Sequence, residues 1–260
     1  MNANEETLSP VGMFDRTERL LGAEAMARLA NVRVILFGVG GVGGWCAESL
    51  VRSGVHHLTL VDCDTVNVTN LNRQVQATTA TIGQLKVEAL RDRLLAINPD
   101  ADITVRAEVY TADTADSFHL EDYDIVIDAI DSLSPKAHLI LHATSLPVTL
   151  LSSMGSALKL DPTKIRVAEF WKVSYCPLAR GLRKKFKHWQ QFPARKFLCV
   201  YSPEVLENQS AEYEEEASPD TFHKVQTNGT VAHITAIFGF TLAGLAIQHI
   251  VETSYYGIST

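Results

Sequence analysis

Paired cysteines are missing from this chain. It has only four cysteines, and no two of them form a CxxC pair; they are Cys46, Cys63, Cys176 and Cys199. A structural zinc site built from thiolates normally takes its ligands from such pairs, so we expect no structural Zn²⁺. Cys46 and Cys63 fall within apolar stretches, which favours small buried core residues. A basic-then-apolar signal pattern is also missing from the N-terminus, which predicts a reducing, cytoplasmic environment.

An unbroken hydrophobic run of membrane-spanning length is also lacking. The most apolar window covers residues 231–251. Polar residues and glycines interrupt it, namely His233, Thr235, Gly239, Thr241, Gly244, Gln248 and His249. This pattern favours a buried helix over a stable membrane span. A peripheral membrane contact through the same segment stays open as an alternative, because an exposed apolar helix would adhere to lipid.

The chain has no overall excess of positive charge. Its 260 residues carry a formal net charge of −7, with 46% apolar and 20% charged residues. This composition is typical of a globular chain and excludes disorder over most of the length. The length suits one large domain better than two small ones. The negative balance argues against a generally basic nucleic-acid-binding protein.

Two segments of the chain depart from this average charge, one toward positive and one toward negative charge. Residues 180–196 contain seven Lys or Arg and no acid, and residues 204–220 contain seven acids and no Lys or Arg. The basic block also holds four aromatic rings, those of Phe186, His188, Trp189 and Phe192. Cations and rings together could hold an RNA backbone and stack on bases. A solvated helix paired with the acidic segment is the alternative.

Apolar runs and helical patterns alternate along the first 155 residues. Strands are expected at 32–37, 57–61, 103–106, 124–129 and 148–152, and helices at 13–30, 45–53, 82–97 and 135–145. Shorter strands at 165–170 and 198–201, the charged blocks and a final helix follow. The alternation predicts an α/β fold with a Rossmann-like, doubly wound and mostly parallel sheet, carrying C-terminal insertions.

A glycine-rich turn joins the first strand to the helix behind it. Gly38-x-Gly40-x-x-Gly43 supplies a tight turn, a close approach for phosphate and a close helix–strand contact. Asp62 follows Gly43 by 19 residues, at the end of the next strand, where a carboxylate accepts from ribose hydroxyls. The pattern predicts a nucleotide site, but it does not separate ATP from NAD.

Three charged side chains further along favour ATP. Arg73, Lys86 and Asp131 all follow strands of the predicted sheet, where ligands of open α/β sheets bind. An enzyme that adenylates a carboxylate must hold three phosphates, Mg²⁺ and the charge that develops on the α-phosphate. Arg73 and Lys86 supply positive charge, and Asp131 supplies a hard oxygen ligand for Mg²⁺. Hydride transfer from NAD needs no residues that hold a triphosphate and Mg²⁺.

The combined motifs resemble the ThiF/MoeB/ubiquitin-activating adenylyltransferase superfamily. The resemblance covers residues 13–155. Its motifs read GxGGxG, DxD, NxxRQ, GxxK and DxxD, at 38–43, 62–64, 70–74, 83–86 and 128–131. The resemblance implies an ATP site made of Gly38, Gly40, Gly41, Gly43, Asp62, Asp64, Asn70 or Asn72, Arg73, Gln74, Lys86, Asp128 and Asp131. It assigns the catalytic contacts to Arg73, Lys86 and Asp131, with Asp131 on Mg²⁺. It also implies a homodimer in which Arg16, or else Arg19, reaches the partner's ATP.

The remainder resembles one branch of that superfamily, the tRNA threonylcarbamoyladenosine dehydratases. The matching stretches include DAIDSLSPKAHLI, SSMGSALKLDPTKIRVAE, CPLARGLRKKFK and GTVAHITAIFGF. This implies one adenylation domain over 1–260, with a nucleotide-binding core at 13–155 and a substrate and dimerisation part at 156–260. It also implies ATP-dependent cyclisation of a tRNA nucleoside. The tRNA contacts would be Arg180, Arg183, Lys184, Lys185, Lys187, Arg195 and Lys196.

Other interpretations remain open at this stage. The chain could adenylate the C-terminus of a ubiquitin-like or sulfur-carrier protein, although relatives of that kind commonly hold zinc with two CxxC pairs. It could also be a nucleotide-binding scaffold without turnover or, less in keeping with the motifs, an NAD dehydrogenase. Cys199 could act as a thioester cysteine or be an ordinary strand residue, and Cys176 is the other thiol to test. A sulfur-relay partner and a monovalent cation at the dimer interface are further possibilities.

Overall fold

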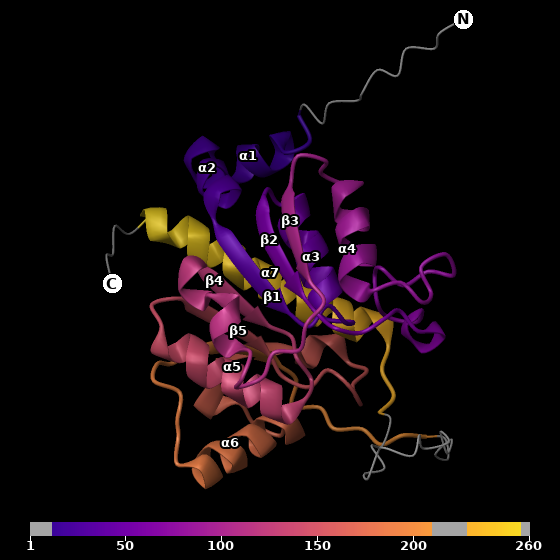
Figure 1. Ribbon diagram of the computed structural model, residues 1–260, viewed down its shortest axis with the longest axis vertical. Helices are drawn as coiled ribbons and strands as arrows, with labels where there is room; N and C mark the ends of the chain where they lie inside the picture. Colours follow the sequence, from indigo (N-terminus) through magenta and orange to yellow (C-terminus); the bar gives the residue numbers. More distant parts are fainter. Residues whose placement is uncertain (1–11, 210–227, 256–260) are drawn as a thin grey trace, which may run out of the picture.

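A seven-stranded sheet organises the molecule. The computed structural model describes residues 12–209 and 228–255 (Figure 1). The strand order is β3-β2-β1-β4-β5-β7-β6, and neighbouring strands are parallel except β6, which runs antiparallel to β7. The strands are β1 Arg33–Phe37, β2 His57–Val61, β3 Asp102–Arg106, β4 Ile125–Asp128, β5 Thr149–Ser153, β6 Arg166–Glu169 and β7 Leu198–Tyr201.

Helices join most of these strands and cover both faces of the sheet. The α-helices are α1 Asp15–Leu21, α2 Ala23–Asn31, α3 Gly43–Arg52, α4 Lys86–Leu95, α5 Leu133–Ser145, α6 Pro177–Trp189 and α7 Ala232–Tyr255. Short 3-10 turns lie at Val68–Asn70, Ala115–Phe118, Leu120–Asp122, Pro162–Lys164 and Phe170–Lys172. The predicted α/β fold, with its doubly wound and mostly parallel sheet and its final helix, is confirmed.

The central strand β1 shows how the sheet divides the core into two layers. Val34 and Leu36 point to one face and pack with α3, α4 and α7, whereas Ile35 and Phe37 point to the other and pack with α5 and α6. All four side chains are at most 1% exposed. A strand buried on both faces shows a continuous apolar run, which is why the sequence pattern located these strands well.

Backbone turns shorten two of the predicted helices. The segment expected at 13–30 is split at Gly22, which has φ +82, into α1 and α2. The segment expected at 82–97 becomes helical only at Lys86, after a turn in which Gly83 has φ +87. Such positive φ values suit glycine and stop a right-handed helix. Cys63, expected in the core, is exposed just beyond the end of β2.

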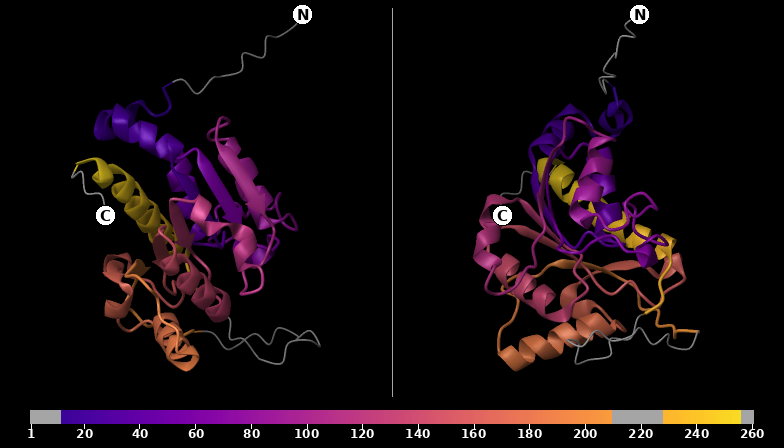
Figure 2. Two further views of the ribbon diagram at one scale, coloured as in Figure 1. Left: turned by 60° about the vertical axis from the view of Figure 1, so that its left-hand side comes forward. Right: turned by 45° about the vertical axis from the view of Figure 1, so that its right-hand side comes forward.

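The final helix α7 lies against α3. A Cβ added at Gly239 would lie 2.9 Å from the backbone nitrogen of Cys46, so only glycine allows this close approach. Ile234, Phe238 and Leu242 of α7 are fully buried in the shared core. Within the described residues, only the segment Ala232–Glu252 is long and apolar enough to cross a membrane, with a mean hydropathy of 1.8. Of this segment 44% is buried, and the expected buried helix is therefore confirmed for the face that packs in the core (Figure 2).

The basic block divides into a helix and a loop. Its helical part is α6, and Phe186 within it is fully buried, so this ring cannot stack on a base. Phe192, which follows the helix, is 56% exposed. Glu204 accepts hydrogen bonds from the backbone N–H groups of Leu160 and Asp161. The rest of the expected acidic loop lies, from residue 210 onward, outside the described residues.

Candidate nucleotide-binding site

The strand order reverses beside β1, and the residues predicted to bind the nucleotide lie around that point, apart from Arg16. Phe37 is in register with Val61 of β2 and with Asp128 of β4, so these three strands end side by side. The backbone N–H of Gly38 donates to the carbonyl of Val61, and that of Ala129 donates to the carbonyl of Phe37, both at 2.8 Å. Open α/β sheets bind ligands in the crevice at such a switch point.

Each glycine of the turn has a separate structural reason. Gly38 has φ +85, and a Cβ there would lie 2.8 Å from the carbonyl oxygen of Ala129. A Cβ at Gly43 would collide with the carbonyl of Gly38. The start of α3 can therefore pack directly against the turn only when residue 43 has no side chain. At Gly40 the nearest atom to an added Cβ is Gln74 Nε2, at 3.8 Å. Space is therefore left beside Gly40, where a phosphate could approach the helix N-terminus.

Asp62 connects the second strand to the glycine turn. Its Oδ2 accepts from the backbone N–H of Val39 at 2.8 Å, and its Oδ1 accepts from that of Asp64 at 2.9 Å. Burial raises the pKa of this carboxyl, although Lys86 nearby acts in the opposite direction. A carboxylate oxygen that already accepts one hydrogen bond can accept another, so a ribose hydroxyl could still donate to it.

Lys86 is a buried cation at the start of a helix. Only 7% of the residue is exposed, and its Nζ lies 2.7 Å from Oδ2 of Asp64. The first residue of α4 is an unfavourable place for positive charge, because the helix dipole is positive there as well. Asp64 offsets part of that cost. The arrangement holds an ammonium group beside the turn, where a polyphosphate would provide further compensation.

Arg73 lies along the other side of the turn. A Cβ at Gly41 would come within 3.3 Å of Arg73 Cγ, and Arg73 Nη1 donates to the carbonyl of Thr69 and to Oδ1 of Asn72. Burial lowers the pKa of this guanidinium, and the charge of Asp131 acts against that effect. Arg73 and the exposed Asp131 therefore lie close enough to interact across the switch point.

The neighbouring amides differ in how much of each side chain the fold already uses. Asn70 is buried, and its Oδ1 accepts from the backbone N–H of Asn67. Asn72 is exposed, and its Nδ2 donates to the carbonyl of Thr230, just before α7. Gln74 Oε1 accepts from Gln76 Nε2, which leaves the Gln74 amide facing Gly40. Of the two asparagines, Asn70 is committed to its own turn.

Two residues that support the site were not predicted from the sequence. Gln76 is 2% exposed, and its Nε2 donates to the carbonyl of Val39. This buried hydrogen bond helps to fix the backbone of the glycine turn. Lys136 is fully buried, with its Nζ 2.8 Å from Oδ2 of the fully buried Asp128. Burial raises the pKa of Asp128, and Lys136 and Ser152 act in the opposite direction. Lys136 falls inside the helix expected at 135–145, and nothing in the sequence indicated that this lysine is buried.

The predicted tRNA-contacting cations divide into two groups. Arg183 donates to the carbonyls of Phe170 and Val173, and Arg195 donates to those of Thr144 and Val148. Lys185 lies over the ring of Trp189 at 4.7 Å. The other four are exposed and form no hydrogen bond or ion pair with the described part of the chain; they are Arg180, Lys184, Lys187 and Lys196.

Arg16 and Arg19 lie at the opposite edge of the sheet. Both are exposed on α1, which precedes α2 and so stands at the amino end of β1 (Figure 1). The glycine turn stands at the carboxyl end of the same strand. Five residues of strand separate the two edges by about 16 Å. Neither arginine therefore lies beside the glycine turn of its own chain.

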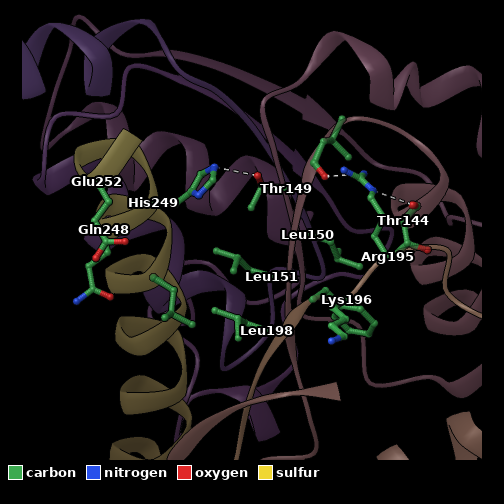
Figure 3. A pocket seen from close by; sticks show the side chains of 13 residues that line it. Thr144, Thr149, Leu150, Leu151, Arg195, Lys196, Leu198, Gln248, His249 and Glu252 are labelled. Carbon is green, nitrogen blue, oxygen red and sulfur yellow. Dashed lines mark hydrogen bonds between the residues drawn. The ribbon is translucent and has the colours of Figure 1, made fainter. Parts of the chain in front are cut away.

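A hollow of about 300 Å³ also lies at that opposite edge (Figure 3). Thr149 at the start of β5, Leu198 at the start of β7 and His249 of α7 line it. His249 Nε2 and Thr149 Oγ1 are 2.9 Å apart. Because the hollow faces the amino ends of the strands, it is separate from the site at the glycine turn.

A cluster of three donor atoms could hold a metal ion. Ligand atoms of Asp62, Cys63 and Asp64 lie within 4.8 Å of one another. Both Asp62 oxygens already accept backbone N–H groups, and Asp64 is paired with Lys86. The exposed carboxylate of Asp131 carries no such protein contacts among the described residues and is the better donor for Mg²⁺.

The fold and this constellation define a nucleotide-binding α/β protein with anchored cations around a glycine turn. The chain belongs to the ThiF family, which matches residues 14–257.

Named relatives are similar over most of the chain. A tRNA threonylcarbamoyladenosine dehydratase of Escherichia coli is 34% identical over 248 residues, which covers 90% of this chain and 92% of the relative. One of Bacillus subtilis is 40% identical over 174 residues, covering 67% and 68%. The crystal structure of the E. coli enzyme in complex with ATP superposes with a TM-score of 0.80 at 32% identity, covering 93% of this chain and 95% of that chain.

Proposed function

We propose that this chain is an ATP-dependent tRNA threonylcarbamoyladenosine dehydratase. Similarity over about nine-tenths of both chains to enzymes of that name supports the activity. The observation that carries the ATP-using chemistry is the pair of anchored cations, Arg73 and Lys86, beside the open side of the glycine turn.

The reaction needs an activated carboxylate, because oxide is a very poor leaving group. A carboxylate oxygen of the threonylcarbamoyl group attacks the α-phosphorus of ATP, and the bond to pyrophosphate breaks. A nucleophilic atom of the carbamoyl group then attacks the acyl carbon and releases AMP, while its proton passes to solvent. The nucleoside has lost the elements of one water. Arg73 and Lys86 would stabilise the charge that develops on the phosphates during the first step.

Mg²⁺ suits the residues at this site. The exposed carboxylate of Asp131 is a hard oxygen donor, and it stands across the switch point from Arg73. When bound, Mg²⁺ would neutralise polyphosphate charge and orient the pyrophosphate leaving group. Asp131 would hold it, Lys86 and Arg73 would hold the phosphates, and Asp62 would hold the ribose. A monovalent cation and a sulfur-relay partner are not needed for these steps.

No cysteine takes part in the proposed reaction. Ring closure is intramolecular and gains from the proximity of the two groups. Cys199 is fully buried in β7, and burial raises the pKa of its thiol far above the usual range. A buried thiol with a raised pKa is a poor nucleophile, because the thiolate is the reactive form. The structure therefore favours the strand-residue interpretation of Cys199.

Helix α6 is proposed as the tRNA-binding surface. Arg180, Lys184 and Lys187 are spaced to share one exposed face of the helix. A Cβ at Gly181 would lie 3.1 Å from Leu133, which follows Asp131 by two residues. The first turns of α6 are therefore close to the carboxyl edge of the sheet. The anticodon loop could reach the ATP site while its backbone follows this helix. We expect the enzyme to act in the cytoplasm, on tRNA present there.

The proposed enzyme is a homodimer whose ATP site draws on both copies. The placement of Arg16 at the amino edge supports this assignment, because it could contact only the nucleotide of another copy. Arg19 is the second choice for the same role. We propose that the chain forms one domain, in which residues 13–155 are the nucleotide-binding core and residues 156–260 bind tRNA and form the dimer.

The decisive experiment offers the enzyme its complete substrate. Purified protein is incubated with Mg·ATP and tRNA that carries threonylcarbamoyladenosine, and the nucleosides are analysed by mass spectrometry. We expect loss of one water from the modified nucleoside, with one AMP and one pyrophosphate released per product. Lys86→Met, with bound tRNA measured in parallel, serves as the inactive control. AMP formation that requires a small carrier protein, with unchanged tRNA, would overturn the proposal in favour of carrier activation.

A further inference from the structure

Lys136 is a buried cation without an assigned role. It is fully buried on α5, as is its partner Asp128 at the end of β4. Its position in the first turns of α5 also places the ammonium near the positive end of the helix dipole. Buried ion pairs of this kind are weak contributors to net stability compared with apolar residues of similar volume. A role in holding a particular backbone conformation explains the pair better.

The contacts of Lys136 converge on one short loop. Its Nζ lies 2.8 Å from Asp128 Oδ2 and donates to the carbonyl of Ile130 at 2.9 Å. The other carboxylate oxygen of Asp128 accepts from the backbone N–H of Ile130 at 3.1 Å, and Ser152 donates to Oδ2. Both backbone polar groups of Ile130 are therefore fixed. The next residue along the chain is Asp131.

The same loop supports the glycine turn. Ala129 donates its backbone N–H to Phe37, and a Cβ at Gly38 would contact the carbonyl of Ala129 and the nitrogen of Ile130. A shift of residues 129–131 would therefore move the Asp131 carboxylate relative to the turn that receives the phosphates. The backbone N–H of Ala129 is bonded to β1, and the carbonyl of Ile130 is bonded to Lys136 of α5. The loop is therefore held by contacts on both sides.

We propose that Lys136 is a positioning residue that fixes the Asp131 carboxylate for Mg²⁺ bound with ATP. Lys136 does not touch the nucleotide, since it is enclosed beneath the loop. Its effect passes through the Ile130 carbonyl and Asp128. The inference rests on the proposed function, in which Asp131 is the ligand of Mg²⁺.

The test compares ATP binding with and without Mg²⁺ by calorimetry on the full chain, with no tRNA present. The measured quantity is the Mg²⁺ gain, defined as the dissociation constant of ATP in EDTA divided by that in Mg²⁺. Asp131→Asn should remove most of this gain. Lys136→Met should reduce it at least about threefold, and should have no further effect in the Asp131→Asn background, because residues acting through one contact are not additive.

A second variant guards against a failure to fold. Lys136→Met alone leaves the buried Asp128 carboxylate without a neutralising cation, which is strongly destabilising. The double variant Asp128→Asn/Lys136→Met removes both charges and keeps similar volumes, but it still lacks the ammonium donor to Ile130. We expect a folded protein with a reduced Mg²⁺ gain and nearly unchanged affinity for ATP in EDTA. A purely structural role would change both affinities alike.

Glu48→Gln is the matched control, because it weakens the pairs of a mostly buried carboxylate with Arg52 and Arg93 away from the loop. It should lower stability and leave the Mg²⁺ gain unchanged. A folded double variant with the wild-type gain would overturn the role of Lys136, provided that Asp131→Asn lowers the gain. A wild-type gain in Asp131→Asn would instead overturn the Mg²⁺ assignment and the inference with it. Absence of ATP binding by the wild type would contradict the proposed function itself.

Discussion

The cations around the glycine turn differ from those on α6 in what the protein does with them. Lys86 and Arg73 are held by contacts to Asp64, Thr69 and Asn72, whereas Lys184 and Lys187 extend from an exposed helix face without partners among the described residues. Fixed cations suit a ligand whose atoms occupy defined positions, such as a triphosphate. Free cations on a helix suit a repetitive polyanion that can bind in several registers.

Lys86→Met gives the largest effect expected from this comparison. The side chain keeps most of its volume but loses the charge beside the turn. We expect the rate of tRNA-dependent AMP formation to fall by about 10²–10³-fold, as on removal of one preorganised stabilising group. The affinity for tRNA should stay within about twofold of the wild type. Lys184→Met is the matched control, and it should lower the affinity for tRNA while the rate of AMP formation changes little. A similar loss of AMP formation in both variants would contradict the distinction between the two groups of cations.

Neutralising the exposed stripe should act on tRNA affinity through salt. For Lys184→Gln/Lys187→Gln we expect the slope of log K against log salt to become shallower by about 1.4, if each lysine neutralises one phosphate of a single-stranded loop. ATP binding measured without tRNA should not change. Arg28→Gln/Arg91→Gln, which removes two cations from α2 and α4, should leave the slope as it is. An unchanged slope in the α6 variant would remove this helix from the tRNA-binding surface.

Arg195 belongs to the basic block in sequence but resembles the anchored cations in structure. Its guanidinium donates to the carbonyls of Thr144 and Val148 at 3.0 Å each. Arg195→Met should therefore lower the free energy of unfolding by about 1–3 kcal/mol, because buried acceptors lose their donors. Denaturant unfolding measures this, with Lys196→Met at the exposed neighbouring position as control. Loss of tRNA affinity without loss of stability would assign Arg195 to the tRNA-binding surface instead.

Cys199→Ala should have the smallest effect on the reaction. We expect tRNA dehydration to continue at a rate within about threefold of the wild type, with a stability loss of about 1 kcal/mol from the small cavity. Nucleoside mass spectrometry and thermal unfolding give the two values. The exposed Cys63, changed to alanine, controls for general thiol loss. An inactive but folded Cys199→Ala protein would revive the thioester interpretation.

The sequence predicted the strands better than the site's supporting contacts. The strand expected at 57–61 has those bounds in the structure, since an apolar run buried on both faces is distinctive. The helices expected at 13–30 and 82–97 were predicted less accurately. Gly22 splits the first into two helices, and the turn at Gly83 delays the start of the second to Lys86, without disturbing the apolar spacing. The 3-10 turns between Ala115 and Asp122 were missed, since turns this short have no periodicity.

The candidate site shows the same limit at the level of side chains. The motifs named the residues that surround the turn, and the fold brings the carboxyl ends of β1, β2 and β4 together. Lys136 and Gln76 were not predicted, because their roles depend on contacts with Ile130 and Val39 that follow from tertiary packing. For the same reason the sequence did not indicate that the guanidinium groups of Arg183 and Arg195 donate to backbone carbonyls.

The close contact at Gly239 has a consequence for the order of events during synthesis. α3 and the turn before it are made early, but Gly239 and Thr235, which lie against them, follow about 200 residues later. At about 5–20 residues per second, that interval is roughly 10–40 s. During this time the nascent nucleotide turn lacks the helix that covers one side of it. Ribosome-bound chains that end before residue 232 should therefore not retain ATP, and the site is completed only as the last helix emerges.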